Sequence, residues 1–199
     1  MAQLLHDFPS RDRFPDVLPE HHEIVRGILV AKAMPTTDHG LLQLRLCSFV
    51  QPFHGRKRTP DVDGDADGGG WWVGTECEIE LFSGPEERYL PDLVGWRIDQ
   101  VPARPRGARI PTWPQWICEI LSPSTASRDI GHKRDAYHRA RVGHYWVVDP
   151  EARTLSVQAW DEAGYRTVLS AGPDTRDVVV RAEPFAGREL DLAWLFDFE

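Results

Sequence analysis

Three ionisable residues stand where the surrounding sequence predicts buried, apolar side chains. Asp92 is at the head of an apolar strand, Glu119 lies inside a hydrophobic strand, and Lys133 is on the inward face of a predicted helix. A buried charge without a partner costs several kcal/mol. Each of the three residues therefore needs an oppositely charged partner or a metal ion.

Two carboxylates on neighbouring strands with a lysine above them form a sensible site for a divalent cation. Mg²⁺ prefers a few oxygen ligands, completed by waters and a substrate phosphate. Lys133 would then hold or help to deprotonate the attacking water and stabilise charge on the phosphorane. Taken singly, the residues also have structural interpretations: Asp92 as a turn or strand-start residue, Lys133 as a surface lysine, or any of the three in a buried ion pair.

Further candidates flank these three residues. Glu76, Glu78 and Glu80 alternate along one predicted strand, and we select Glu78 as an accessory ligand or base, although that face can equally be exposed to solvent. His39, at the start of a predicted helix, is an accessory candidate whose alternative is a structural hydrogen bond. Tyr137 shares a helical face with Lys133 and is expected to pack beside it.

The elements that must position these residues follow from hydrophobic periodicity and turn signals. We predict a single domain over 1–199 with an extended N-terminal arm at 1–19, and no internal repeat. Two helices are predicted, one from near His39 to before Pro52 and one over 128–142 with Ser127 as its N-cap. The predicted strands comprise two short ones within 23–34, then 71–82, 89–96, 116–121, 145–148 and a C-terminal meander over 154–160, 165–169 and 178–180, closed by the run 190–196.

The polar, glycine-rich segment 54–70 reads as a mobile loop. Within it, Asp63–Gly68 matches the first half of an EF-hand calcium loop, but Gly74 stands where the loop needs a bidentate glutamate. No helix pattern flanks the segment. A solvated acidic loop is therefore the preferred interpretation, and calcium regulation through 61–70 is the alternative.

Composition excludes several classes of protein. The formal net charge of −8 argues against a general nucleic-acid coat protein, but not against a nuclease, which needs positive charge only where the backbone docks. The three cysteines form no metal-binding pattern. The N-terminus lacks an export signal and no apolar run reaches membrane-spanning length, so we expect a cytoplasmic protein. Phosphate loops, nucleophile elbows and zinc-protease motifs are absent.

Basic residues in three segments could form a rim that faces phosphate. The predicted second helix carries a local excess of positive charge, and arginines also gather at 104–109 and 56–58. An ordinary solvated helix surface explains the same charges.

Four motifs, in this order and spacing, resemble the Uma-two family, which is described as "putative restriction endonuclease" within the PD-(D/E)XK nuclease superfamily. They are Tyr-Leu-Pro91-Asp92-Leu-Val-Gly-Trp, Cys-Glu119-Ile-Leu-Ser-Pro-Ser-Thr125, Lys133-Arg-Asp-Ala-Tyr137 and His-Tyr145-Trp-Val-Val-Asp-Pro150. The resemblance extends over nearly the whole chain, from Met34 to the closing Phe-Ala-Gly-Arg-Glu-Leu-Asp-Leu-Ala run.

The resemblance implies an α/β (α+β) fold of the restriction-endonuclease type: a central mixed β-sheet flanked by helices, here with an antiparallel C-terminal meander. It implies Asp92 and Glu119 as ligands of Mg²⁺ or Mn²⁺, completed by the backbone carbonyl of Ile120. The expected substrate is DNA, the expected reaction is phosphodiester hydrolysis, and the expected assembly is a homodimer.

One position departs from the wider superfamily. In its usual E-x-K strand motif, the carboxylate and the lysine lie two residues apart on one face. Here the second position is Leu121, so Lys133 on the following helix is the natural replacement. The same departure is expected of a catalytically silent module that binds nucleic acid or a protein partner, and this stays as the alternative function.

Overall fold

A six-stranded mixed sheet forms the centre of the computed structural model, which describes residues 14–55, 70–82, 87–122, 126–175 and 178–197. Only β8 and β9 pair in parallel; the other neighbours are antiparallel. The mixed central sheet confirms the predicted fold class. Across the sheet the order is β11 (Arg166–Ala171), β10 (Thr154–Ala159), β9 (His144–Asp149), β8 (Trp116–Ile120), β6 (Leu93–Arg97) and β3 (Trp71–Thr75).

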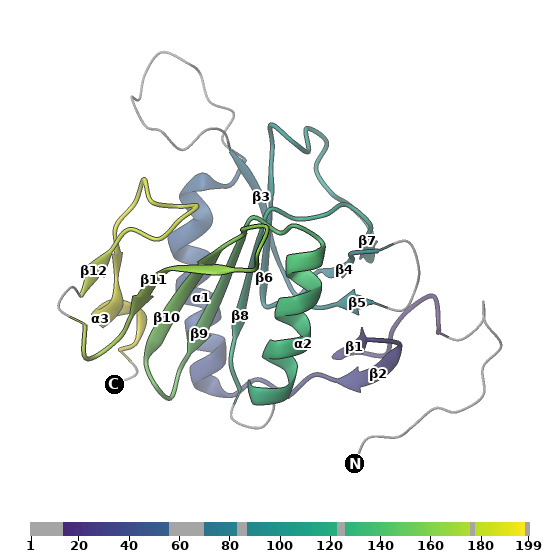
Figure 1. The fold of residues 1–199 in the computed structure, drawn as a ribbon, viewed down its shortest axis with the longest axis horizontal. Helices are drawn as coiled ribbons and strands as arrows, with labels where there is room; N and C mark the ends of the chain where they lie inside the picture. The colour runs from purple at the N-terminus through teal and green to yellow at the C-terminus, as the bar shows by residue number, and fades with distance from the viewer. Residues whose placement is uncertain (1–13, 56–69, 83–86, 123–125, 176–177, 198–199) are drawn as a thin grey trace.

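One long helix covers each face of this sheet (Figure 1). The first, α1 (Thr37–Val50), begins after Thr36, whose hydroxyl accepts a hydrogen bond from the backbone N–H of His39 at 3.2 Å. This N-cap satisfies a free donor and fixes His39 in the first turn. The second, α2 (Ala126–Arg139), lies on the opposite face. The predicted helix starts two residues later, so Ser127 lies inside α2 and its predicted role as the N-cap is wrong.

Alternation along β8 divides the core between these two helices. Trp116, Cys118 and Ile120 pack into the core that contains α1, whereas Ile117 packs into the core that contains α2. Because side chains alternate across a strand, Glu119 shares the face of Ile117 and points to α2. The position of Glu119 inside β8 therefore determines which helix can supply its partner.

A second, five-stranded sheet lies beside the central one and brings the N-terminal hairpin to the site (Figure 1). The hairpin turns at Gly27, where φ is +73°, as the sequence predicts for two short strands around this glycine. Strand β2 of this hairpin lies at the edge of the five-stranded sheet. The order is β2 (Ile28–Ala31), β1 (His22–Val25), β5 (Arg88–Tyr89), β4 (Glu78–Glu80) and β7 (Arg109–Ile110).

Two of the connections between the two sheets break strands that the sequence predicts as continuous. The predicted strand 71–82 is interrupted at Glu76, whose φ of 50° is left-handed, so β3 and β4 belong to different sheets. The predicted strand 89–96 is interrupted around Pro91, so β5 and β6 are separated in the same way. Asp92 lies directly after the break between β5 and β6, at the corner where the two sheets meet.

The C-terminal part matches the prediction up to β11. β9, β10 and β11 form an antiparallel meander, but β12 (Val179–Val180) pairs instead with β13 (Leu190–Asp191) in a separate two-stranded sheet. The closing run forms β13 and the short helix α3 (Leu192–Leu195), and a 3₁₀ turn η1 (Gln51–Phe53) follows α1. The predicted loop 54–70, with its acidic run, falls mostly outside the described residues.

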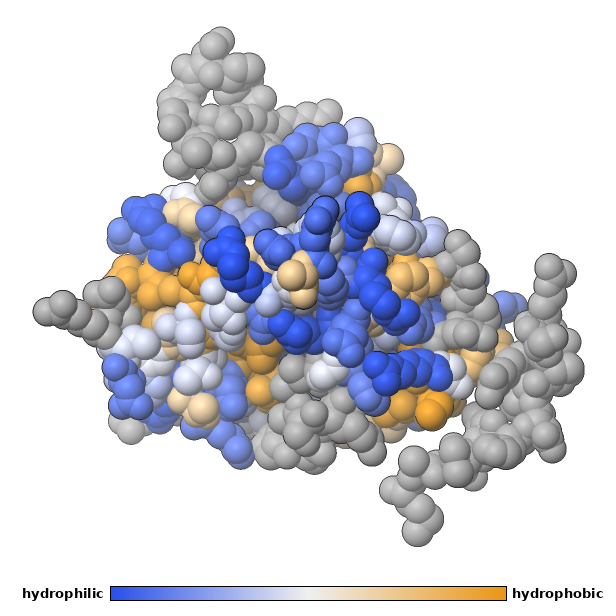
Figure 2. All heavy atoms as spheres, in the orientation of Figure 1, coloured by the Kyte–Doolittle hydropathy of each residue, from blue (hydrophilic) through white to orange (hydrophobic). Residues whose placement is uncertain are grey.

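The surface differs between the two sides of the molecule. The face over α2 is mostly hydrophilic, while apolar residues gather over the C-terminal elements (Figure 2). There a hollow of about 620 Å³ is lined by residues that include Val178, Leu192, Trp194 and Phe196. Among the described residues, the helices fall short of the length and apolar character needed to cross a lipid bilayer.

Candidate metal centre

Asp92 is the central residue of a buried cluster of charges. Its side chain is 1% exposed, and both carboxylate oxygens have partners. Oδ1 lies 2.7 Å from Nζ of Lys32 and 3.2 Å from Nε2 of His39. Oδ2 accepts a hydrogen bond of 2.6 Å from the backbone N–H of Ile120. Asp92 is thus tied to β8 on one side and to the N-terminal segments on the other.

Glu119 receives its partners from α2, as the alternation of β8 dictates. Lys133 donates to both carboxylate oxygens, at 3.2 and 3.3 Å, and the hydroxyl of Tyr137 donates to Oε1 at 2.6 Å. Lys133 and Tyr137 are four residues apart, so they lie on one face of the helix. The expected convergence of Glu119, Lys133 and Tyr137 is present.

Glu23, in β1, completes the environment of Lys133. Its Oε1 lies 2.9 Å from Nζ of Lys133 and accepts a second hydrogen bond, of 2.7 Å, from the backbone N–H of Leu90. Lys133 therefore bridges two buried carboxylates, Glu23 and Glu119. Glu23 is 3% exposed, and its place on a hydrophobic strand is the sequence signal for its burial.

Lys32, like Glu23, is a residue of this cluster that the sequence analysis did not name as a candidate. It follows β2, and its Nζ donates to Asp92 Oδ1 at 2.7 Å, to the Leu90 carbonyl at 2.8 Å and to Glu76 at 2.9 and 3.0 Å. The chain has only three lysines, at positions 32, 57 and 133, among 23 basic residues. Two of the three lie in this cluster, and this scarcity is a signal that could have identified Lys32.

Glu76 approaches Asp92 because of its unusual backbone. Its left-handed conformation turns the chain between β3 and β4, and Gln43 of α1 donates to both Glu76 Oε1, at 3.4 Å, and the Asp92 carbonyl, at 3.0 Å. As a result, ligand atoms of His39, Glu76 and Asp92 all lie within 4.8 Å of one another. Neighbouring ligands of an octahedral Mg²⁺ are roughly 3 Å apart, so this spacing suits a divalent ion.

The electrostatics of the cluster favour a cation. Four carboxylates, of Glu23, Glu76, Asp92 and Glu119, face the ammonium groups of Lys32 and Lys133. The cluster thus holds two more acidic than basic side chains. In addition, Nδ1 of His39 is buried with no hydrogen-bond partner among the described residues. The donor set of carboxylates and one imidazole fits Mg²⁺ or Mn²⁺.

The two central carboxylates respond differently to burial. Burial opposes ionisation of Asp92, but the hydrogen bond from His39 and the charge of Lys32 outweigh it and hold the pKa of Asp92 below its usual range. For Glu119, burial dominates over the attraction of Lys133, and the nearby charges of Asp92 and Glu23 add to it, so its pKa is raised to about 7. Desolvation would lower the pKa of Lys133, but Glu119 and Glu23 raise it well above its ordinary value.

The structure does not bring Glu78 into this cluster. Its carboxylate accepts a hydrogen bond of 2.6 Å from Nε of Arg88, which is fully buried. Arg88 also donates to the backbone carbonyls of Pro15 and Asp16. Among the described residues, Glu78 thus serves a buried ion pair of the second sheet, while His39 and Tyr137, the other accessory candidates, contact Asp92 and Glu119 directly.

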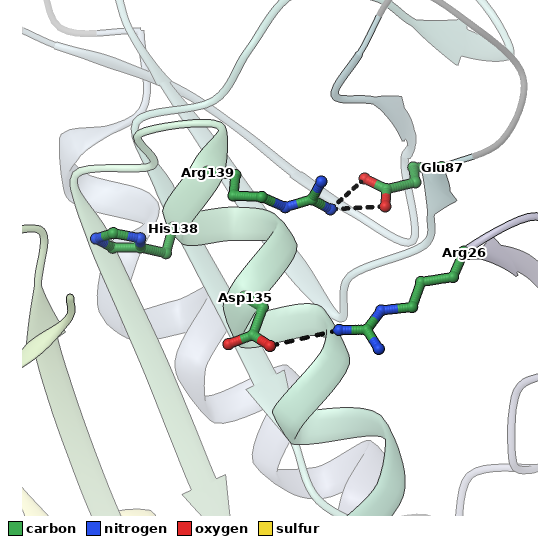
Figure 3. A pocket seen from close by; sticks show the side chains of 5 residues that line it. All are labelled: Arg26, Glu87, Asp135, His138 and Arg139. Atoms are coloured by element: carbon green, nitrogen blue, oxygen red, sulfur yellow. Dashed lines mark hydrogen bonds and ion pairs between the residues drawn. The ribbon is translucent and has the colours of Figure 1, made fainter.

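A surface pocket of about 660 Å³ lies beside α2, on the side of the helix that faces β1 and β5 (Figure 3). It is lined by Arg26, Glu87, Asp135, His138 and Arg139. Arg139 pairs with Glu87 at 2.7 and 2.9 Å, and Arg26 pairs with Asp135 at 3.5 Å. Because each arginine has an acidic partner, this part of the expected basic rim is locally neutral.

Comparison with known proteins agrees with the fold and the motifs. A family model described as "Putative restriction endonuclease" matches residues 10–193. A crystal structure described as a "putative nuclease belonging to DUF820", from Anabaena variabilis ATCC 29413, has a similar fold, with a TM-score of 0.68 and 20% sequence identity over 90% of this chain and 93% of that chain. Curated proteins give no significant match. The match over nearly the whole chain places this protein in the Uma2 family of putative restriction endonucleases.

Proposed function

We propose that this protein is an endonuclease that hydrolyses phosphodiester bonds of DNA with Mg²⁺ or Mn²⁺. The observation that carries the proposal is the buried cluster around Asp92, in which four carboxylates face two lysines. Such an excess of acidic over basic groups inside a protein is costly unless protons or a cation compensate it. Family membership makes nucleic acid the expected substrate.

In this proposal Asp92 is the shared ligand of the ion. On the β8 side, we expect Glu119 and the backbone carbonyl of Ile120 as further ligands of the ion. On the α1 side, the further ligands are His39 and Glu76, whose ligand atoms lie near those of Asp92. When bound, the ion would polarise the phosphate and lower the pKa of a bound water.

Lys133 acts in the proposal as a positive charge. Because Glu119 and Glu23 raise its pKa well above the ordinary value, it remains an ammonium at neutral pH and cannot take a proton from water. It can orient a water through its N–H groups and stabilise negative charge on a phosphate oxygen. The sequence predicts that Lys133 either holds the attacking water or helps to deprotonate it. We therefore assign Lys133 the first role and not the second.

The test is cleavage of supercoiled plasmid DNA by the purified protein with Mg²⁺ or Mn²⁺, compared with its Asp92→Asn variant. We expect the substitution to slow cleavage on the order of a hundredfold to a thousandfold, which is the usual effect of losing one major stabilising group. Asp99→Asn is the matched control, since Asp99 follows the other end of β6 and pairs with Arg97 at the surface. Undiminished cleavage by Asp92→Asn would refute the assignment.

The second candidate function is a catalytically silent module that binds nucleic acid or a protein partner. Two observations favour it: Leu121 occupies the usual lysine position, and Asp92, Glu119 and Lys133 are each at most 6% exposed. Calorimetric titration with Mn²⁺ discriminates between the two functions. Saturable binding that weakens in Glu119→Gln supports the nuclease, whereas no saturable binding to either protein supports the silent module.

The expected homodimer belongs to the same proposal, because two active sites in one assembly can cut both strands of a duplex in a single encounter. Light scattering on the purified protein measures its mass in solution. A monomer at all concentrations would remove the dimer from the proposal, and nicking of one strand would then be the expected reaction.

A further inference from the structure

The ammonium group of Lys32 lies where a metal ion would have to bind. It contacts Asp92 and Glu76, which together with His39 offer the ligand atoms that lie close enough to hold a metal ion. Its acceptors are carboxylate oxygens and the backbone carbonyl of Leu90. Carboxylates and backbone carbonyls are also the ligands that hard cations prefer. The ammonium group of Lys32 is therefore itself the cation in an environment that suits a metal ion.

Lys32 is held by more acceptors than it has donors. Four oxygen atoms lie between 2.7 and 3.0 Å from Nζ, whereas an ammonium has three N–H groups. A compact charge surrounded in this way satisfies Asp92 and Glu76 without a metal.

The position of Lys32 allows it to leave. It follows β2, an edge strand of the five-stranded sheet, and its side chain is 13% exposed. Glu76, its other partner, is 36% exposed, so this part of the cluster reaches solvent. Lys133 offers a contrast, because it lies within α2 and its side chain is 6% exposed. A long, unbranched side chain at a sheet edge can withdraw, whereas the helical lysine is enclosed.

We propose that Lys32 is the resident cation of the metal-free protein and that a divalent ion binds at Asp92 by displacing its ammonium group. This inference rests on the proposed metal-dependent function and adds its regulation: affinity for the ion is reduced by an internal competitor. Once displaced, Lys32 becomes a mobile positive charge beside the site, suited to contact a substrate phosphate.

Calorimetric titration of Lys32→Met with Mn²⁺ tests the displacement. Removal of the competitor should tighten binding on the order of tenfold to a hundredfold, since a hydrogen-bonded charge contact is worth that factor. Arg26→Met is the matched control, because it removes one positive charge from the same hairpin at a side chain that is 53% exposed. Equal or weaker binding by Lys32→Met, equal tightening by Arg26→Met, or no saturable binding to either the parent or Lys32→Met overturns the inference.

A second measurement uses the unaltered protein and is independent of how well the variant folds. Acetylation of lysines by an amine-reactive reagent, followed by mass spectrometry, reports the accessibility of Lys32 and Lys133 separately. We expect Lys32 to react several-fold faster at saturating Mn²⁺ and Lys133 to stay unchanged. Unchanged reactivity of Lys32 at saturating Mn²⁺ overturns the displacement.

The outcomes separate this inference from the proposed nuclease activity. Plasmid cleavage with unchanged Lys32 reactivity would leave the nuclease and remove the displacement. Tighter Mn²⁺ binding by Lys32→Met, with faster acetylation of Lys32 but no cleavage by either protein, would keep the displacement and remove the nuclease.

Discussion

Asp92 separates two regions that use the same chemical arrangement, a lysine between two carboxylates. In the closed half, Lys133 bridges Glu23 and Glu119. In the open half, Lys32 bridges Asp92 and Glu76. The closed half is built from β1, β8 and α2, deep between the two sheets. The open half is built from the end of β2, the turn after β3 and the start of α1.

The difference between the two halves is access to water. In the closed half the three charged side chains are all less than a tenth exposed, and Tyr137 donates a further hydrogen bond to Oε1 of Glu119. In the open half Glu76 is 36% exposed and can turn to solvent. The same ion pair therefore has different energetic consequences: structural stabilisation in the closed half, and an exchangeable cation in the open half.

The largest expected effect is on stability when the closed half loses its lysine. Lys133→Met leaves Glu23 and Glu119 buried without a cation, and removing one partner of a buried pair costs about 3–5 kcal/mol of unfolding free energy. Lys32→Met should cost less, about 1–2 kcal/mol, because Asp92 retains His39 and the Ile120 N–H and because Glu76 can reach water. Urea unfolding followed by circular dichroism measures both. Equal losses would show that the two halves are equally closed.

The next effect is on the pH dependence of stability, which should differ in sign between Asp92 and Glu119. Folded Glu119 keeps its proton up to about pH 7, whereas the unfolded chain releases it near 4.5. Between these values the folded state binds more protons, so the unfolding free energy falls as pH rises, on the order of 3 kcal/mol in total. Asp92 has a lowered pKa, so its contribution is present above about pH 4 and is lost on acidification.

Unfolding by urea at pH 5, 6, 7 and 8 isolates the contribution of Glu119. The difference between the parent protein and Glu119→Gln should shrink in magnitude or change sign across this range, since glutamine mimics the protonated acid at every pH. Asp99→Asn is the control, because Asp99 follows the other end of β6 and pairs with Arg97 at the surface. A constant difference for Glu119→Gln would contradict the raised pKa.

The sequence identified the closed half better than the open half, for a physical reason. Glu119 and Lys133 are charged residues within otherwise apolar patterns, so local sequence alone shows that they need partners. Lys32 and Glu76 lie at a strand end and in a turn, where charged residues are ordinary. Only tertiary structure brings them to Asp92. The scarcity of lysine was the available signal for Lys32, and it is a property of the whole chain rather than of a local pattern.

The fold was predicted with the same limits. β8, β9 and both long helices followed from hydrophobic periodicity, whereas the mixed sheet was implied by the resemblance to the family. The breaks at Glu76 and Pro91 did not, because the alternation continues across both positions while the chain changes sheets. Strand pairing over long sequence separations decides that change. Nothing local required a left-handed backbone at Glu76, where the side chain is neither glycine nor asparagine.

The smallest effect expected is from Tyr137→Phe, which tests one hydrogen bond of the closed half. Tyr137 is fully buried and contacts Tyr89 and Tyr145, with ring centroids 5.4 Å apart in each case. Phenylalanine preserves these contacts and removes only the 2.6 Å hydrogen bond to Glu119. A hydrogen bond to a charged group contributes about 1.5–3 kcal/mol, and partial protonation of Glu119 reduces this, so we expect a loss of about 1 kcal/mol.

The matched control is Tyr145→Phe. Its hydroxyl is buried without a hydrogen-bond partner among the described residues, so its removal should be neutral or slightly stabilising in the same urea experiment. Because both substitutions remove one oxygen from adjacent rings, their difference measures the contribution of the Tyr137–Glu119 bond alone. If the two variants lose the same stability, Tyr137 only fills space beside Glu119, and the closed half depends on Lys133 for its charge compensation.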